Sequence, residues 1–414
     1  MRDAVSGQPA LASPARPRLL LAVLAVLALL AAACGPAHAT GGSGPAAGAT
    51  SPAARSTAAT APLPAGRVGP RSAVPWTRVG PGWVLAQYTT SGNPDTGTPG
   101  PARPVDLYLV DPAGGRYLMY RWPAGQGQQW QLVDWSGDKA RALFQIGGTA
   151  TVVQLALAQG TMSRFSLPVN VSAQAYTLPE GTNLLAVTQP PGAGPAELER
   201  FDLTGALRAT LARGPDIGRP ASSADGTTLA VGASTGVELV SNAGGRPRLL
   251  RVPGVDRRLG CSAVRWWDAS TLLAQCIPAR ASAPQLWLVP DGGGAPSSLT
   301  PVRSGRGPDL GDINAWRLPS GLYVQALGPC GTEFIARQAA NGSLTQVSIA
   351  GTSGNNRVLG VTGGRMLVQA QVGCPGSSSL LWLDPATGAA QTLLAPARGQ
   401  RGVLGAVPYG RPNG

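Results

Sequence analysis

The chain has 414 residues and carries 33 lysine and arginine residues against 20 aspartate and glutamate residues, a formal net charge of +13. Its only histidine, His38, precedes the region predicted to fold, which excludes a Ser-His-Asp or Cys-His nucleophile and a histidine-rich metal site there. The positive charge favours anionic partners such as lipid headgroups or acidic wall polymers. Nucleic acid is not favoured, because the arginines are spread along the chain whereas a nucleic-acid-binding domain clusters its charge.

The N-terminus predicts export from the cytoplasm. Arg16 and Arg18 precede an unbroken apolar run from Leu19 to Ala33. The run is shorter than the roughly 20 residues that a membrane-spanning helix needs and has the length of a signal-peptide core. We therefore expect a signal peptide over residues 1–33.

The end of the apolar run, Ala31-Ala32-Ala33-Cys34-Gly35, resembles the lipobox of bacterial lipoproteins. The resemblance covers only these residues, and Ala31 stands where that family usually has leucine. It implies that Cys34 is acylated and that the chain is held on the outer face of the cell membrane. Two alternatives are open: cleavage near Ala37-His38-Ala39, which gives a secreted protein, and an uncleaved anchor. All three place the protein outside the cytoplasm.

Residues 34–74 are predicted to form a flexible linker. They consist mainly of Ala, Gly, Pro, Ser and Thr, with hardly a large apolar side chain. Such a segment cannot bury enough surface to offset the entropy lost on ordering. It would hold the domain that follows at a distance from a membrane.

From residue 75 to residue 414 one phrase recurs seven times, most clearly as ADGTTLAVG (224–232): a turn followed by a short apolar strand. The seven copies are at 80–87, 136–145, 179–188, 224–232, 268–276, 319–327 and 362–370. A second strand with its own turn follows each copy, at 105–115, 151–160, 196–205, 236–245, 284–293, 333–342 and 379–388. Short apolar runs between such turns predict β-strands, and no stretch shows helical periodicity.

The spacing of the repeats predicts a β-propeller. The first turns contain Gly82, Gly137, Gly181, Gly226, Ser270, Gly321 and Gly364, which are 55, 44, 45, 44, 51 and 43 residues apart. A period in the forties with three or four strands per unit is typical of propeller blades, and a closed ring leaves only short sheet edges. We expect an all-β, seven-bladed β-propeller; rings of six or eight blades and a pair of β-sandwiches are the alternatives.

Two segments compete for the inner strand of the first blade. The tail RGVLGAVPYG (401–410) is similar to RVLGVTGG (357–364), which opens the seventh repeat, so the tail would close the ring on strands from Trp83 onward. Alternatively, residues 76–79 fill that place and the tail packs below them.

Residues 222–231, SSADGTTLAV, resemble the SPDG repeat of TolB-type propellers, and residues 135–138 are a looser version. The resemblance covers one repeat well, and it implies an extracytoplasmic binding or scaffolding protein. The dipeptide Trp267-Asp268 is similar to that of WD40 repeats but departs from their pattern, because it precedes the second strand of its blade instead of ending the third. The turn at Asp225 also lacks the aromatic residue that the Asp-box of sialidases has at the expected place. A resemblance to sialidases therefore gives no support for glycosidase activity.

Four cysteines besides Cys34 predict disulfides in an exported domain. Cys276, Cys330 and Cys374 end the second strand of their repeats, and Cys261 is on the strand before Cys276. The simplest pairing is Cys261–Cys276 within a blade and Cys330–Cys374 between blades, with the other two pairings open. A metal site is not expected, because no C-x-x-C motif or histidine accompanies these thiols.

Arginines recur in the segments predicted to connect the blades, at Arg213, Arg219, Arg257, Arg258, Arg303, Arg306, Arg357, Arg398 and Arg401. In a ring they would surround one mouth, where guanidinium groups favour carboxylates or phosphates. Our candidates for binding an anionic ligand are Arg257, Arg258, Arg306, Arg357 and Arg401. The alternative is that an arginine-rich surface has arginine in every loop. Asp309, Asp312 and Asn314 form the best group of oxygen ligands, but we expect them to cap turns.

These observations favour a monomeric, membrane-anchored, non-catalytic propeller that binds a protein or an anionic envelope component and needs no cofactor. The alternative is an exported hydrolase or lyase that acts on a glycan-like substrate through carboxylates.

Overall fold

The computed structural model describes residues 61–410 except 93–100, 148, 191, 193, 216, 307–309, 354, 374 and 375. The predicted signal peptide, Cys34 and most of the predicted linker lie outside the described residues. The helical segments of the described part are short 3-10 turns: η1 (Arg71–Ala73), η2 (Trp76–Arg78), η4 (Gly127–Gln129) and η5 (Pro329–Gly331). None of the helices in this part is long and apolar enough to cross a membrane.

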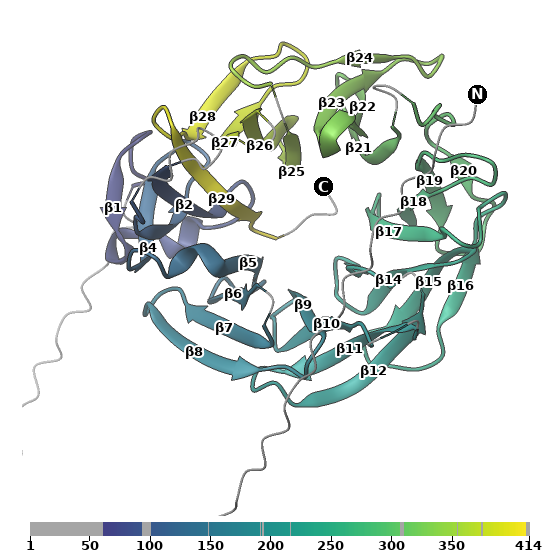
Figure 1. Ribbon diagram of the computed structural model, residues 1–414, viewed down its shortest axis with the longest axis horizontal. Coiled ribbons are helices and arrows are strands. Elements are labelled where there is room, and N and C mark those ends of the chain that lie inside the picture. The colour runs from purple at the N-terminus through teal and green to yellow at the C-terminus, as the bar shows by residue number, and fades with distance from the viewer. Residues whose placement is uncertain are drawn as a thin grey trace, which may run out of the picture. The chain divides into compact units, whose positions relative to one another are not determined.

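Antiparallel sheets are arranged as blades of a ring (Figure 1). Five blades are separate four-stranded sheets, and in each of them the strands run in chain order from the centre of the ring outward. The second blade has β5 (Trp130–Trp135), β6 (Arg141–Ile146), β7 (Thr151–Ala156) and β8 (Thr161–Ser166). The third has β9 (Val171–Tyr176), β10 (Asn183–Thr188), β11 (Ala196–Asp202) and β12 (Leu207–Gly214). The fourth has β13 (Ala221–Ser222), β14 (Thr228–Ala233), β15 (Gly236–Ser241) and β16 (Arg248–Arg251). The fifth has β17 (Cys261–Trp266), β18 (Thr271–Cys276), β19 (Gln285–Pro290) and β20 (Ser297–Ser298). The sixth has β21 (Asp312–Leu318), β22 (Gly321–Leu327), β23 (Glu333–Gln338) and β24 (Leu344–Gln346).

The first and seventh blades share one nine-stranded sheet, joined by a parallel bridge between Ser378 and Gly402. The seventh blade has β25 (Asn356–Thr362), β26 (Arg365–Gly373), β27 (Gly376–Leu383) and β28 (Ala390–Leu394). The first has β29 (Gln400–Pro408), β2 (Val84–Gly92), β3 (Val105–Val110) and β4 (Arg116–Trp122). The chain is therefore a seven-bladed β-propeller, as the repeat spacing predicts.

The C-terminal strand closes the ring. β29 is the inner strand of the first blade and pairs with β2 from Val84 opposite Pro408 to Gly92 opposite Gln400. Of the two alternatives for this place, the tail is confirmed, whereas residues 76–78 form η2. The propeller also includes residues ahead of 75, because β1 (Val68–Pro70) pairs in parallel with β4 as an additional outer strand.

The hydrophobic core lies between neighbouring blades. Leu143 and Val152 of the second blade pack in one buried cluster with Leu184 and Phe201 of the third. Each fully buried leucine contributes about 2 kcal/mol to folding. Because a blade buries its two faces only against its neighbours, single repeats are not stable alone and the ring must close.

Glutamines on second strands add polar bridges between blades. Gln145 on β6 donates to the carbonyl of Val171 at 3.1 Å and accepts from the amide of Ala173 at 2.9 Å, both on β9 of the next blade. Gln87 bridges the first and second blades in the same way, through the Trp130 carbonyl and the Leu132 amide. These side chains satisfy backbone groups of the next inner strand, which limits sliding between blades.

A disulfide joins Cys261 and Cys276, which lie opposite each other on β17 and β18, with an S–S distance of 2.06 Å. This is the within-blade bridge of the simplest predicted pairing. Cys374 lies outside the described residues, so the bridge from Cys330 to Cys374 stays a prediction.

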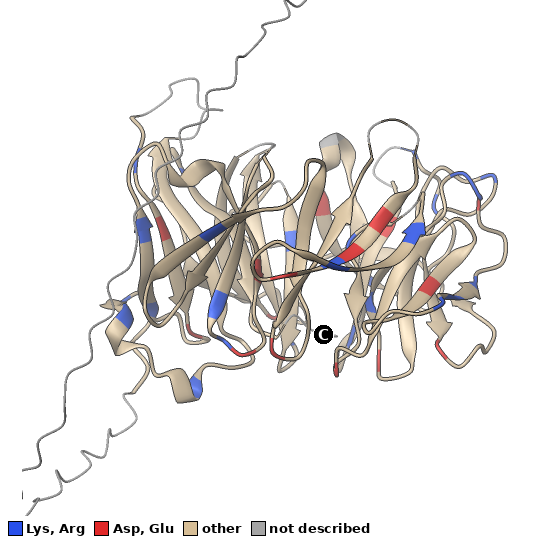
Figure 2. Ribbon diagram, turned by 90° about the horizontal axis from the view of Figure 1, so that it is seen from below, with Lys and Arg blue, Asp and Glu red and all other residues tan. Residues whose placement is uncertain are grey.

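Because the strands of each blade alternate in direction, their connections alternate between the two ends of the ring. We call one end the turn face: it has the turns between first and second strands and between third and fourth strands. The other end, the loop face, has the loops between second and third strands and those from one blade to the next. Figure 2 shows the ring from its edge, with acidic turns along its lower border.

Candidate functional site

The described turns and loops of the two faces differ in charge. Among the described residues, the turns of the turn face contain the acidic residues Asp111, Asp138, Glu180, Asp225, Asp268, Asp291 and Asp384, and the basic residues Lys139 and Arg246. The described parts of the loops on the loop face contain Arg103, Arg219, Arg257, Arg258, Arg280, Arg303, Arg306 and Arg398. Asp256 is the only acidic residue in those described parts.

The carboxylates of the turn face hold their own turns. Asp225 accepts hydrogen bonds from the Ser223 hydroxyl at 2.6 Å and the Thr227 amide at 3.1 Å. These bonds lower the pKa of Asp225, with the Ser223 hydroxyl as the largest cause. Asp384 accepts from the amide of Ala386 at 2.9 Å, and that bond is the main reason why its pKa is lowered. The Asp225 and Asp384 carboxylates are thus structural parts of the repeat.

Three arginines of the loop face are held by the fold. Arg303 lies 2.8 Å from Asp312, and both side chains are buried, at 9% and 0% exposure. Arg303 also donates to the carbonyl of Gly342. Arg213 pairs with Glu197 at 3.1 Å, and Arg219 lies 3.8 Å from Asp134, where contact is looser.

Of the remaining two members of the predicted oxygen-ligand group, only Asn314 is described. Asp309 lies outside the described residues, and the Asn314 side-chain oxygen accepts from the amide of Ala315 at 2.9 Å and from Arg265 at 3.4 Å. Asp312, the third member, is paired with Arg303. No group of three or more His, Cys, Asp or Glu side chains among the described residues could hold a metal ion.

The five predicted anion-binding arginines all lie at the loop face. Arg257 and Arg258 are exposed in the loop between β16 and β17, and Arg306 is exposed in the loop between β20 and β21. Arg357 and Arg401 differ from the expectation, since they are the second residues of the inner strands β25 and β29 and not loop residues. None of the five takes part in an ion pair within the described part of the chain.

Arg357 has an acidic neighbour. Burial raises the pKa of Glu333 on β23, and the positive charge of Arg357 partly opposes that rise. The side-chain amide of Gln325 also donates to Glu333. Arg357 is therefore a weaker candidate for an external anion than Arg257, Arg258 or Arg306.

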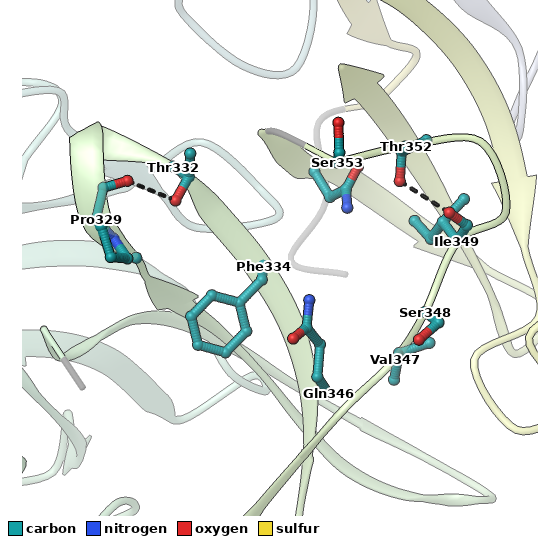
Figure 3. Close-up of a pocket in the computed structure, with 11 residues that line it drawn as sticks. Pro329, Thr332, Phe334, Gln346, Val347, Ser348, Ile349, Thr352 and Ser353 are labelled. Carbon is teal, nitrogen blue, oxygen red and sulfur yellow. Dashed lines mark hydrogen bonds between the residues drawn. The ribbon is translucent and has the colours of Figure 1, made fainter. Parts of the chain in front are cut away.

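A cavity of about 300 Å³ opens at the loop face between the sixth and seventh blades (Figure 3). It is lined by Gly328, Pro329, Thr332, Phe334, Gln346, Val347, Ser348, Ile349, Thr352, Ser353 and Asn356. None of these side chains is charged, so the cavity differs chemically from the arginine-bearing loops. The sequence did not point to it, because its residues come from four separate elements.

No protein-family model matches the chain, and no curated protein sequence matches it. A puromycin hydrolase structure is similar with a TM-score of 0.49 and 18% identity, over 77% of this chain and 52% of that chain. TolB from Acinetobacter baumannii has a TM-score of 0.40 and 14% identity, over 83% and 87% of the two chains. An oligogalacturonate lyase in complex with manganese has a TM-score of 0.44 and 15% identity, over 70% of this chain and 81% of that chain.

The chain spans about half the length of the puromycin hydrolase that it resembles. These likenesses concern the propeller fold and carry nothing about activity. The strand pairings define a β-propeller, and the charged side chains in the described loops of its loop face are mostly arginines.

Proposed function

We propose that this chain is a non-catalytic, extracytoplasmic binding propeller whose loop face binds an anionic component of the cell envelope. The separation of charge between the two faces carries the proposal. Most acids in the described turns of the turn face hydrogen-bond to their own turns. In contrast, Arg257, Arg258 and Arg306 are exposed and make no ion pair within the described part.

Guanidinium chemistry suits such a ligand. Arginine donates two parallel hydrogen bonds to a carboxylate or phosphate and stays charged at any physiological pH. Several exposed arginines on one face raise the local concentration of a polyanion, and salt screens the attraction. We therefore expect binding that weakens as ionic strength rises.

Acylation of Cys34 would complete this role. The signal-like N-terminus and the lipobox-like residues support a lipid anchor, and the composition of the linker supports a tether. In this proposal the linker holds the propeller at a distance from the membrane, within reach of acidic wall polymers.

The test compares two matched triple variants of the full chain. Replacing Arg257, Arg258 and Arg306 with serine should lower retention on immobilised polyphosphate and polyglutamate at least about tenfold in affinity, since each exposed ion pair contributes about 0.5–1 kcal/mol. The control replaces the exposed Arg67, Arg78 and Arg246, which removes the same charge away from the loop face.

The control variant should bind like the wild type, and both variants should keep the wild-type unfolding midpoint. Equal loss of retention in the two variants would show that net charge alone binds the polymers, and it would overturn the assignment to the loop face. Comparison of polyphosphate with polyglutamate shows which anion is preferred.

Glu333 supports a second candidate function, a hydrolase or lyase that acts through carboxylates. Burial raises its pKa, as a general acid requires, and it lies at the loop face. Cleavage of an acidic glycan by the wild type, lost in Glu333→Gln, would favour this function over binding alone.

A further inference from the structure

The cavity between the sixth and seventh blades has the composition of a site for a neutral ligand. Its walls come from the loop after β22, from β23, from the end of β24 and the segment after it, and from the first residue of β25. The polar side chains among them are hydroxyls and amides, and Phe334 supplies an aromatic ring. Six of the eleven lining residues have polar side chains, so a ligand there would be recognised through hydrogen bonds as well as through apolar contact.

Two hydroxyls of the cavity already donate their protons to the backbone. Thr332 donates to the carbonyl of Pro329 at 2.8 Å, and Thr352 donates to the carbonyl of Ile349 at 3.0 Å (Figure 3). A hydroxyl has one proton and two lone pairs, so each oxygen is left as an acceptor. These two hydroxyls can therefore accept hydrogen bonds from a ligand.

Asn356 adds a further acceptor. The residue lines the cavity and is 6% exposed, and its side-chain oxygen is buried with no hydrogen-bond donor in the described structure. Leaving a buried amide oxygen without a donor costs free energy. The terminal torsion of asparagine is broad, so the amide can turn its oxygen toward a ligand in the cavity.

Charged ligands do not fit these walls. An anion would meet the lone pairs of Thr332 and Thr352 with no cation among the lining residues, and a cation would find no carboxylate. The volume of about 300 Å³ is at the lower end of small-molecule sites. The ligand is therefore small, uncharged and able to form hydrogen bonds.

We propose that this cavity binds one uncharged sugar ring of an envelope glycan. A pyranose offers hydroxyl donors around its edge for Thr332, Thr352 and Asn356. Its C–H face can lie on the negative face of the Phe334 ring. The site goes beyond the polyanion binding proposed above, because it shares none of the arginines.

The experiment measures binding of neutral methyl glycosides of glucose, mannose, galactose and N-acetylglucosamine to the full chain by saturation-transfer NMR and calorimetry. Thr332→Val removes one acceptor at nearly constant volume, and Phe334→Ala removes the ring; each should weaken binding about tenfold. Phe334→Tyr keeps the ring and should bind like the wild type.

Glucuronate and inorganic phosphate serve as charged probes and should not compete for the cavity. Failure of all four glycosides to bind the wild type would overturn the proposal, as would wild-type affinity in both Thr332→Val and Phe334→Ala. The serine variant of Arg257, Arg258 and Arg306 should keep glycoside binding, and Thr332→Val should keep retention on polyphosphate. The two proposals can therefore fail separately.

Discussion

The two faces of this ring are built from connections between the same strands, yet they use charge in different ways. On the turn face, aspartates such as Asp225 and Asp384 accept hydrogen bonds from their own turns. On the loop face, Arg257, Arg258 and Arg306 are exposed and make no ion pair within the described part of the chain.

A charged side chain is available to bind a ligand only where it has no partner within the fold. Arg303 shows this within the loop face, because Asp312 and the Gly342 carbonyl occupy its guanidinium. A count of basic residues would have treated Arg303 and Arg306 as equivalent. Because of these surroundings, Arg303 is a structural residue, whereas Arg306 is a candidate for binding.

The largest expected effect concerns close packing at the turn face. A β-carbon on Gly137 would lie 1.8 Å from the carbonyl oxygen of Pro179 in the next blade, whereas one on Gly218, at the loop face, would meet nothing within 4 Å. Gly137→Ala should lower the free energy of unfolding by about 2–3 kcal/mol, and Gly218→Ala should change it by less than about 0.5 kcal/mol. Both substitutions reduce the entropy of the unfolded chain equally. The difference between their free energies of unfolding therefore measures the steric contact between residue 137 and Pro179. Equal urea midpoints would contradict the close approach of these turns.

The next effect concerns the turn face alone and is the pH dependence of the free energy of unfolding. Hydrogen bonds lower the pKa of Asp225 and Asp384 in the folded state. Their stabilisation is therefore complete above the unfolded pKa of about 4 and is lost as the pH falls through the lower folded values. Unfolding free energy should drop below about pH 4, and a double variant with asparagine at both positions should show a flatter pH curve. Parallel curves for the variant and the wild type would mean that these turns do not depend on ionised aspartate.

The smallest effect concerns Glu333, whose pKa moves in the opposite direction. Since burial raises the folded pKa, this group favours the folded state below its unfolded pKa and opposes it once the pH has risen through the folded pKa. Glu333→Gln should therefore stabilise the protein slightly at pH 8 and should have less effect at pH 4. A variant that is less stable than the wild type at pH 8 would show that the attraction to Arg357 outweighs burial.

Much of the fold could be predicted because the repeat is local. Strands of four to six residues between glycine turns set the unit, and the spacing of Gly137, Gly181 and Gly226 sets the blade. The sequence offers two segments for the inner strand of the first blade, and in the structure β29 occupies this place. β1 was missed, because three residues paired in parallel at an outer edge leave no periodic pattern.

The site was less predictable, because it depends on partners far apart in the chain. Arg303 and Gly342, Gln145 and Val171, and Glu333 and Arg357 come together only when blades stack. Arg357 and Arg401 were expected in loops and lie on inner strands. The neutral cavity had no sequence signal of its own.

The architecture follows from the sequence, because a pattern repeated seven times supplies apolar strands that can be buried only by stacking into a ring. The tertiary structure alone decided which charges and cavities are left over, because hydrogen bonds and ion pairs between blades join residues whose spacing along the chain carries no pattern. Local periodicity encodes the blade. The contacts between blades determine the surface that can bind.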